Sequence, residues 1–173
     1  MPVAEGNKGL SRVKELYQDR PQRVNELKAE GRKVIGYLCI YPILEMMTAL
    51  DLVPYRLFGD MREPITKADA CLPPMVCPFL RSSLDLALKD KYPFLDGMVM
   101  AHICDVGERM AHIWRTYIDY PYFYFMDVPH TTHKAALDMF KEEIKGFQKS
   151  LESFTGKEIS AEKLKQAIRV HND

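Results

Sequence analysis

The stretch KVIGYLCIYPILEMMTALDLVPYRLF, residues 33–58, decides the fold. It begins with a continuous apolar run, KVIGYL (33–38), which is typical of a strand buried on both faces. The composition of LEMMTAL (44–50) favours a helix, and VPYRLF (53–58) favours a second strand. Strand, helix and strand in this order predict a parallel unit whose helix crosses over one face of a sheet.

The same alternation continues downstream of this unit. FLRSSLDLALKD (79–90) predicts a helix, residues 95–103 a third strand, residues 105–118 a helix and residues 122–128 a fourth strand. Right-handed crossovers then give a Rossmann-like four-stranded parallel sheet flanked by helices, an α/β fold. The block contains no GxGxxG motif, so the sequence does not support dinucleotide binding of the usual Rossmann kind.

Helical segments are expected on both sides of this sheet. We divide the chain into a helical arm (1–30), a Rossmann-like α/β domain that carries the cysteines (31–135), and a helical segment (136–173) that leads to a second domain outside this sequence. Gly31 is placed to end the arm, because glycine is favoured just after a helix C-terminus. In the last segment, apolar residues recur at steps of three and four, which predicts a long amphipathic helix.

The overall composition excludes some classes of protein. Lys and Arg total 24 and Asp and Glu total 24, so there is no cationic excess of the kind that nucleic-acid binding requires. No apolar run approaches the ~20 residues that would span a bilayer, and the first residues lack the apolar core of a secretory signal. We therefore expect a cytoplasmic protein with no nucleic-acid or membrane partner, in which thiols stay reduced.

Four cysteines are present, and three of them are expected to meet at one edge of the sheet. Ligands of open parallel sheets bind outside the carboxyl ends of the strands. Cys39 and Cys104 follow the first and third predicted strands, and Cys77 directly precedes a helix. A helix N-terminus favours the thiolate, which is the form that binds iron in iron–sulfur sites. The positions alone leave two alternatives open, a metal cluster or unreactive half-buried thiols.

Four blocks of sequence together carry a family resemblance. They are GYLCIYPILEMMTALDLVPYRLFGD (36–60), CPFLRSSLDLAL (77–88), LDGMVMAHICDVGERMAHIW (95–114) and YFYFMDVPH (122–130). In order and spacing they resemble the N-terminal half of a subunit of the 2-hydroxyacyl-CoA dehydratase and benzoyl-CoA reductase family. The pairing of CPFLRS with the later Cys-Asp carries most of this resemblance.

The resemblance implies a cofactor and two of its ligands. Subunits of this family hold a [4Fe–4S] cluster through three cysteines, and Cys77 and Cys104 match the first two of these positions. The third cysteine belongs to the C-terminal half, so the resemblance places it outside this chain. Cys39 matches a position that is often cysteine near the cluster without binding it, and Cys71 has no counterpart.

The resemblance also implies an activity and partners. The chain would be the iron–sulfur subunit, or an N-terminal part of it, of an ATP-activated dehydratase or reductase that passes single electrons to an acyl-CoA thioester. Its partners would be a second homologous subunit, an ATP-dependent iron–sulfur activator protein and the acyl-CoA substrate, and the isolated chain is expected to be inactive. A reductase relative with a double-cubane cluster fits the same motifs, and a cluster-free α/β structural or binding domain is the alternative of another class.

Three histidines lie near the expected functional edge. His102 is expected to be structural, although it lies close to Cys104 in the sequence. His130 and His133 follow the fourth predicted strand, so they are candidates for proton transfer or for contact with coenzyme A. Arg81 is expected to form a surface ion pair rather than to bind a phosphate.

Overall fold

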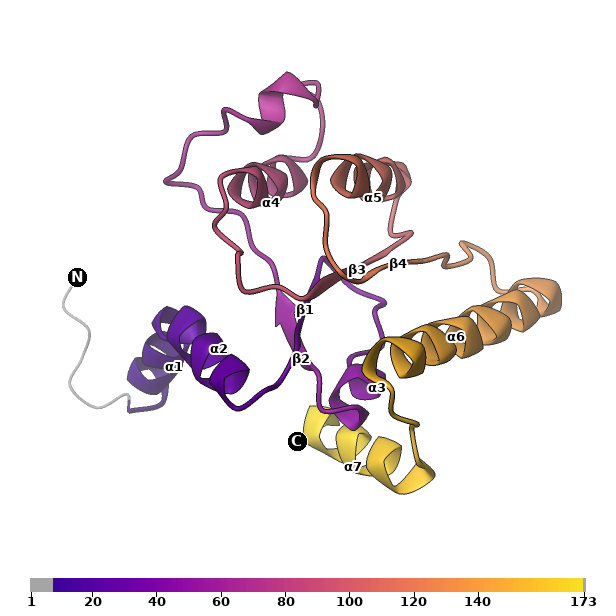
Figure 1. Cartoon of the computed structure of the whole chain (residues 1–173). Coiled ribbons are helices and arrows are strands. Elements are labelled where there is room, and N and C mark those ends of the chain that lie inside the picture. The colour runs from indigo at the N-terminus through magenta and orange to yellow at the C-terminus, as the bar shows by residue number, and fades with distance from the viewer. Residues whose placement is uncertain (1–7, 173) are drawn as a thin grey trace.

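The computed structural model describes residues 8–172 of the chain, drawn as a ribbon in Figure 1. Its helices and strands follow the predicted order. The helices are α1 (Lys8–Gln18), α2 (Arg20–Ala29), α3 (Leu44–Ala49), α4 (Pro78–Leu88), α5 (Asp105–Tyr117), α6 (Lys134–Thr155) and α7 (Ala161–Asn172), with a short 3-10 helix η1 (Ala68–Ala70). The strands are β1 (Val34–Tyr37), β2 (Val53–Arg56), β3 (Gly97–Ala101) and β4 (Phe123–Met126).

The four strands form one parallel sheet in the order β2-β1-β3-β4, which confirms the predicted α/β fold. In the register, Ile35 of β1 lies between Pro54 of β2 and Gly97 of β3. Proline is compatible with this place because β2 is an edge strand, where an N–H facing outward has no strand partner. The chain leaves the central pair β1 and β3 in opposite directions across the sheet, so their carboxyl ends form a topological switch point.

Helices cover both faces of the sheet. In Figure 1, α4 and α5 lie over one face, and α3, α6 and α7 lie over the other. Trp114 of α5 is fully buried in the first layer, and Phe147 of α6 is fully buried in the second. These two apolar layers account for the continuous hydrophobicity of β1 and β3, which are buried on both sides.

The helical arm of α1 and α2 lies beside the β2 edge of the sheet (Figure 1). Val24 of α2 enters the core, and the Lys28 Nζ atom donates to Asp96 Oδ1 at 2.8 Å. Gly31 has φ 82°, the left-handed conformation expected just after a helix C-terminus. The prediction of a helical arm is confirmed for residues 8–29, and positions 1–7 lie outside the described residues.

Two side chains begin the C-terminal helices. The His133 Nδ1 atom accepts a hydrogen bond of 3.2 Å from the Ala136 N–H, so His133 caps α6, which begins slightly before the expected boundary at 136. The Ser160 hydroxyl accepts from the Lys163 N–H at 3.2 Å and caps α7. Along residues 8–172, no helix has both the length and the apolar character needed to cross a membrane.

Candidate functional site

The candidate site lies at the carboxyl ends of β1 and β3. Cys39 follows β1, Cys104 follows β3, and Cys77 immediately precedes α4. Because β1 and β3 are neighbours in a parallel sheet, the loops that follow them leave from the same edge. The structure therefore places all three cysteines on the side where open α/β sheets bind ligands.

Cys104 is the N-cap residue of α5, and its thiol is exposed. The Sγ atom accepts a hydrogen bond of 3.4 Å from the Gly107 N–H. A Cβ atom at position 107 would lie 2.5 Å from Ile103 Cγ1, so glycine is needed for this close approach of helix and loop. The sulfur lies at the positive end of the helix dipole, where a thiolate is stabilised.

Cys77 occupies the equivalent position on the neighbouring helix. It is the N-cap residue of α4, it is exposed, and its side chain makes no capping hydrogen bond. Pro78 follows at the first helical position, where the missing N–H has no cost. The chain therefore presents two exposed thiols, each at the N-terminus of a helix of more than ten residues.

Cys39 is half-buried in a loop with an unusual backbone. Cys39 has φ 59° and Tyr41 has φ 77°, a left-handed conformation that is strained for residues with a side chain. Burial raises the pKa of the Cys39 thiol, negative charge on Cys77 and Cys104 raises it further, and Arg56 opposes the rise. The electrostatic effect of Cys77 and Cys104 on Cys39 agrees with the placement of all three residues at the carboxyl ends of the strands.

Within residues 8–172 these groups do not form a complete metal site. In the part that the structure describes, no three His, Cys, Asp or Glu side chains lie close enough together to hold a metal ion. Cys77 and Cys104 are the two exposed thiols at helix N-termini, and a cysteine thiolate is a side chain that can ligate iron.

Cys71 lies apart from this group in its interactions. Its Sγ–H donates to the Ala68 carbonyl at 3.4 Å, at the end of η1, and burial raises the pKa of its thiol. These contacts give Cys71 a local role in the loop that leads to α4.

Helix α4 holds the loop that precedes Cys77. The Asp85 Oδ1 atom, on a buried side chain, accepts from the N–H groups of Thr66 at 2.8 Å and Ala68 at 2.9 Å. Arg81 pairs with Asp69 and donates to the Pro74 carbonyl at 3.1 Å, which confirms the expected ion pair. The position of Cys77 is therefore fixed by its own helix on one side and by this anchored loop on the other.

A group of polar side chains lies beside Cys104. The His102 Nδ1 atom is 3.1 Å from Asp127 Oδ1, and the His102 and His130 ring centroids are 4.5 Å apart. The His102 Nε2 atom lies 3.8 Å from Glu108 Oε2. His102 thus has structural partners, as expected, while Asp127 was not identified from the sequence because nothing in the residue order pairs it with a distant histidine.

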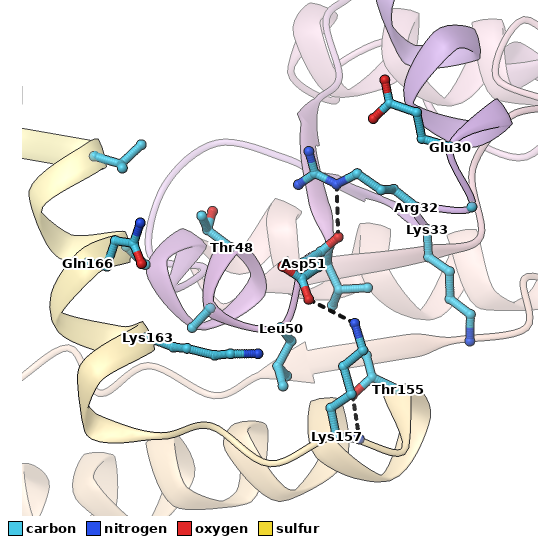
Figure 2. A pocket seen from close by; sticks show the side chains of 15 residues that line it. Glu30, Arg32, Lys33, Thr48, Leu50, Asp51, Thr155, Lys157, Lys163 and Gln166 are labelled. Atoms are coloured by element: carbon cyan, nitrogen blue, oxygen red, sulfur yellow. Dashed lines mark hydrogen bonds and ion pairs between the residues drawn. The ribbon is translucent and has the colours of Figure 1, made fainter.

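A cavity of about 780 Å³ lies at the opposite edge of the sheet, at the amino ends of β1 and β2 (Figure 2). Several cationic side chains line it, and three of them bind groups at nearby helix ends. Arg32 Nε donates to the Asp51 carbonyl at 3.1 Å, Lys157 Nζ lies 2.8 Å from Asp51 Oδ2, and Lys33 Nζ donates to the Phe154 carbonyl at 3.3 Å. Arg32 and Lys33 thus bind carbonyls at or just past the C-terminal ends of α3 and α6, and Lys157 pairs with the Asp51 carboxylate. This cavity is therefore a structural junction and not the candidate site.

Comparison with known proteins identifies what this arrangement is similar to. Residues 39–173 match the family described as "2-hydroxyglutaryl-CoA dehydratase, D-component". The chain is 28% identical over 170 residues to a benzoyl-CoA reductase subunit of Thauera aromatica, which covers 95% of this chain and 44% of that protein. It is 24% identical over 173 residues to the (R)-phenyllactyl-CoA dehydratase beta subunit of Clostridium sporogenes, covering 99% of this chain and 46% of that protein.

A third relative, the beta subunit of (R)-2-hydroxyglutaryl-CoA dehydratase from Acidaminococcus fermentans, is 28% identical over 151 residues, which is 84% of this chain and 39% of that protein. The chain therefore spans less than half the length of the curated relatives it matches. The family match begins at Cys39, so it includes every cysteine of the chain.

Proposed function

The chain belongs to the 2-hydroxyglutaryl-CoA dehydratase D-component family, and from this premise we propose that it is the iron–sulfur subunit, or part of it, of an ATP-activated 2-hydroxyacyl-CoA dehydratase or benzoyl-CoA reductase-like enzyme. The observation that supports this proposal is the pair of exposed thiols, Cys77 and Cys104, at two helix N-termini beside the switch point of the sheet.

In this proposal Cys77 and Cys104 are two of the ligands of a [4Fe–4S] cluster, and the third thiolate comes from outside the chain. The N-termini of α4 and α5 stabilise the negative charge of both thiolates. The Gly107 N–H directs the Cys104 sulfur before any metal is present, because it already donates to that atom. A bound cluster supplies single-electron transfer, which is the chemistry that no side chain of this chain provides.

The chain's own residues would shape the surroundings of the two sulfurs. Cys39 and Tyr41 lie in a strained loop that follows β1, and burial raises the pKa of the Cys39 thiol. The half-buried Cys39 is less accessible to iron than the exposed Cys77 and Cys104. This difference supports Cys39 as a neighbour of the cluster and not as a ligand.

The names of the relatives support the proposed partners. Each of these three relatives is a named subunit of an enzyme that acts on a coenzyme A thioester. From these names we propose that the chain assembles with a second related subunit and passes electrons toward an acyl-CoA. From the family resemblance we propose that it receives these electrons from an ATP-dependent iron–sulfur activator protein.

The experiment that tests the proposal is reconstitution of the chain with iron and sulfide in the absence of oxygen, with dithiothreitol supplying the thiolate that the chain lacks. We expect a brown protein with broad absorption near about 400 nm, from thiolate-to-iron charge transfer. Cys77→Ser and Cys104→Ser should each lose this absorption. Cys71→Ser is the matched control and should keep it, because the Cys71 thiol is engaged with the Ala68 carbonyl.

A colourless and well-folded protein with freely titratable thiols would instead support a cluster-free α/β binding domain. Iron content per chain, measured on the same samples, separates a single cluster from the double-cubane cluster of a reductase relative.

A further inference from the structure

A second cavity, of about 550 Å³, lies between the helical arm and the loop that follows β2. Its lining combines aromatic rings with cations. The residues that matter here are Tyr17, Arg20, Tyr55, Phe58, Arg62 and Tyr92. We call this cavity the arm pocket.

The arm pocket lies near the carboxyl ends of the strands, as the thiols do. Phe58 follows Arg56, the last residue of β2, and Arg56 is paired in register with Tyr37 at the end of β1. Arg56 also acts electrostatically on the Cys39 thiol, whose pKa it lowers against the effect of burial. The pocket, Arg56 and the three thiols are therefore neighbours along one edge.

Arg20 is held in the pocket by three aromatic rings. Its Cζ atom lies 4.3 Å from the Tyr55 ring centroid, 4.8 Å from that of Phe58 and 5.8 Å from that of Tyr17. One of its terminal nitrogens donates to the Arg56 carbonyl at 2.6 Å, and in residues 8–172 the side chain makes no other hydrogen bond. A guanidinium has five N–H donors, so most of them stay available to an anion.

Aromatic surface is open to solvent at the same place. The Tyr17 side chain is 59% exposed, and its ring centroid is 6.1 Å from that of Phe58. Arg56 borders the pocket without lining it, and its Cζ atom lies 5.5 Å from the Phe58 ring centroid. Exposed aromatic rings beside arginines are the combination that stacks a nucleobase and binds its phosphates.

The charge of the pocket also favours a phosphate. Asp60 is neutralised by Arg62, whose Nε atom lies 3.2 Å from Asp60 Oδ1. Arg20 makes no ion pair with an acidic side chain in the described residues, so the lining, with Arg20, Asp60 and Arg62, has a net positive charge. A carboxylate at the rim thus does not cancel the attraction for an anion.

We propose that the arm pocket binds an adenine nucleotide, with the base against Tyr17 and Phe58 and the phosphates on Arg20 and Arg56. This inference rests on the proposed function, from which we take the nucleotide to be the adenine nucleotide of an acyl-CoA. A coenzyme A thioester carries this nucleotide at one end and the reacting group at the other. Neighbouring strands lie about 4.8 Å apart, so two strand spacings separate β2 from β3. The pantetheine arm of an acyl-CoA bridges this separation from the pocket to the thiol edge.

Binding to the iron-free full chain tests the proposal, with coenzyme A, ADP and pantetheine as the three probes in isothermal titration calorimetry. We expect saturable binding of coenzyme A, weaker binding of ADP and none of pantetheine. Tyr17→Ala and Arg56→Gln should each weaken coenzyme A binding about tenfold, the range for loss of one stacked base or one charged hydrogen bond. Tyr117→Ala, at a tyrosine that is 57% exposed on α5, and Arg115→Gln are matched controls and should leave binding unchanged.

Three results would overturn the proposal: no saturable binding of either nucleotide, equal effects of the pocket variants and the controls, or binding of pantetheine alone. Tighter binding of ADP than of coenzyme A would overturn the assignment to an acyl-CoA. Circular dichroism of Tyr17→Ala shows whether the arm helices remain folded. Arg56 lies outside the arm, so Arg56→Gln tests nucleotide binding independently of the folding of the arm. Because the chain carries no iron in this experiment, its failure is distinct from a failure of iron to bind at Cys77 and Cys104.

Discussion

Replacement of Asp85 by alanine should destabilise the fold strongly, because this carboxylate joins α4 to the loop before Cys77. Asp85 is 1% exposed. It accepts hydrogen bonds from the N–H groups of Thr66 and Ala68, and its Oδ2 atom lies 2.6 Å from Lys89 Nζ. Its loss therefore removes two hydrogen bonds between the helix and the loop, together with an ion pair to the C-cap residue of the same helix.

The expected magnitude follows from what each partner loses in Asp85→Ala. Ala68 is buried, so its unpaired N–H costs about 1–3 kcal/mol, and loss of the charged bond to Lys89 costs about 1.5–3 kcal/mol. Thr66 is exposed and can bond to water, and Lys89 keeps its hydrogen bond to the Pro64 carbonyl at 2.7 Å. We therefore expect the free energy of unfolding to fall by about 3–5 kcal/mol.

Urea-induced unfolding followed by far-ultraviolet circular dichroism measures this change. Asp138→Ala is the matched control, since Asp138 pairs with Lys141 only on the exposed face of α6, at 3.6 Å. The control should change the free energy of unfolding by less than about 0.5 kcal/mol. A loss below about 1 kcal/mol in Asp85→Ala would refute the reasoning.

The pH dependence of Asp85→Asn provides an independent check. Burial alone would raise the pKa of Asp85, but the bonds from Lys89, Ala68 and Thr66 outweigh it and hold the pKa below its ordinary value. A carboxyl with a lowered pKa stabilises the fold above the pKa of the unfolded chain, about 3.9, and this stabilisation is lost as the pH falls through the folded pKa. The stability advantage of the wild type over Asp85→Asn should therefore shrink below about pH 4.

Three further predictions concern single residues. Gly107→Ala should lower the free energy of unfolding by about 1–3 kcal/mol, because the added Cβ has no room. Gly9→Ala, where nothing lies within 4 Å, should stabilise α1 by about 0.5–1 kcal/mol. Equal effects of the two substitutions in thermal unfolding would contradict this. His133→Ala should cost about 1 kcal/mol through the lost helix cap without altering iron binding, and a selective loss of iron would assign His133 to the site instead. Burial raises the pKa of Tyr120 and Tyr122 to about 12. The unfolded chain therefore loses these protons first, and the free energy of unfolding should fall between about pH 10 and pH 12. Phenolate absorption from both tyrosines near pH 10 would argue against their burial.

The sequence predicted the sheet well because its signals are local. KVIGYL and LDGMVMAHI are continuous apolar runs, and such runs mark strands covered on both faces. The observed strands are shorter at their ends, as in β3, which covers Gly97–Ala101 of the expected 95–103. Strand ends depend on where backbone pairing stops, and the order of residues does not record this.

The candidate site was predicted only in part. Local sequence predicted that Cys77 precedes a helix and that Cys104 follows a strand, and the structure confirms both places. Their assignment as cluster ligands came from the family resemblance and stays a prediction. The left-handed backbone of Cys39 and Tyr41 was not predicted, because neither residue type favours positive φ and the conformation is imposed by the surrounding fold. The partner of His102, Asp127, lies 25 positions away, so tertiary structure alone brings the two together.

The most direct test of the central claim is to map which thiols iron protects from alkylation, by mass spectrometry of the chain before and after oxygen-free loading with iron and sulfide. In the iron-free chain, the exposed Cys77 and Cys104 should react quickly, and Cys39 and Cys71 slowly, because burial raises the pKa of both thiols. After loading, the account predicts protection of Cys77 and Cys104 together. Unchanged alkylation of these two thiols, or protection that falls on Cys71 instead, would contradict it.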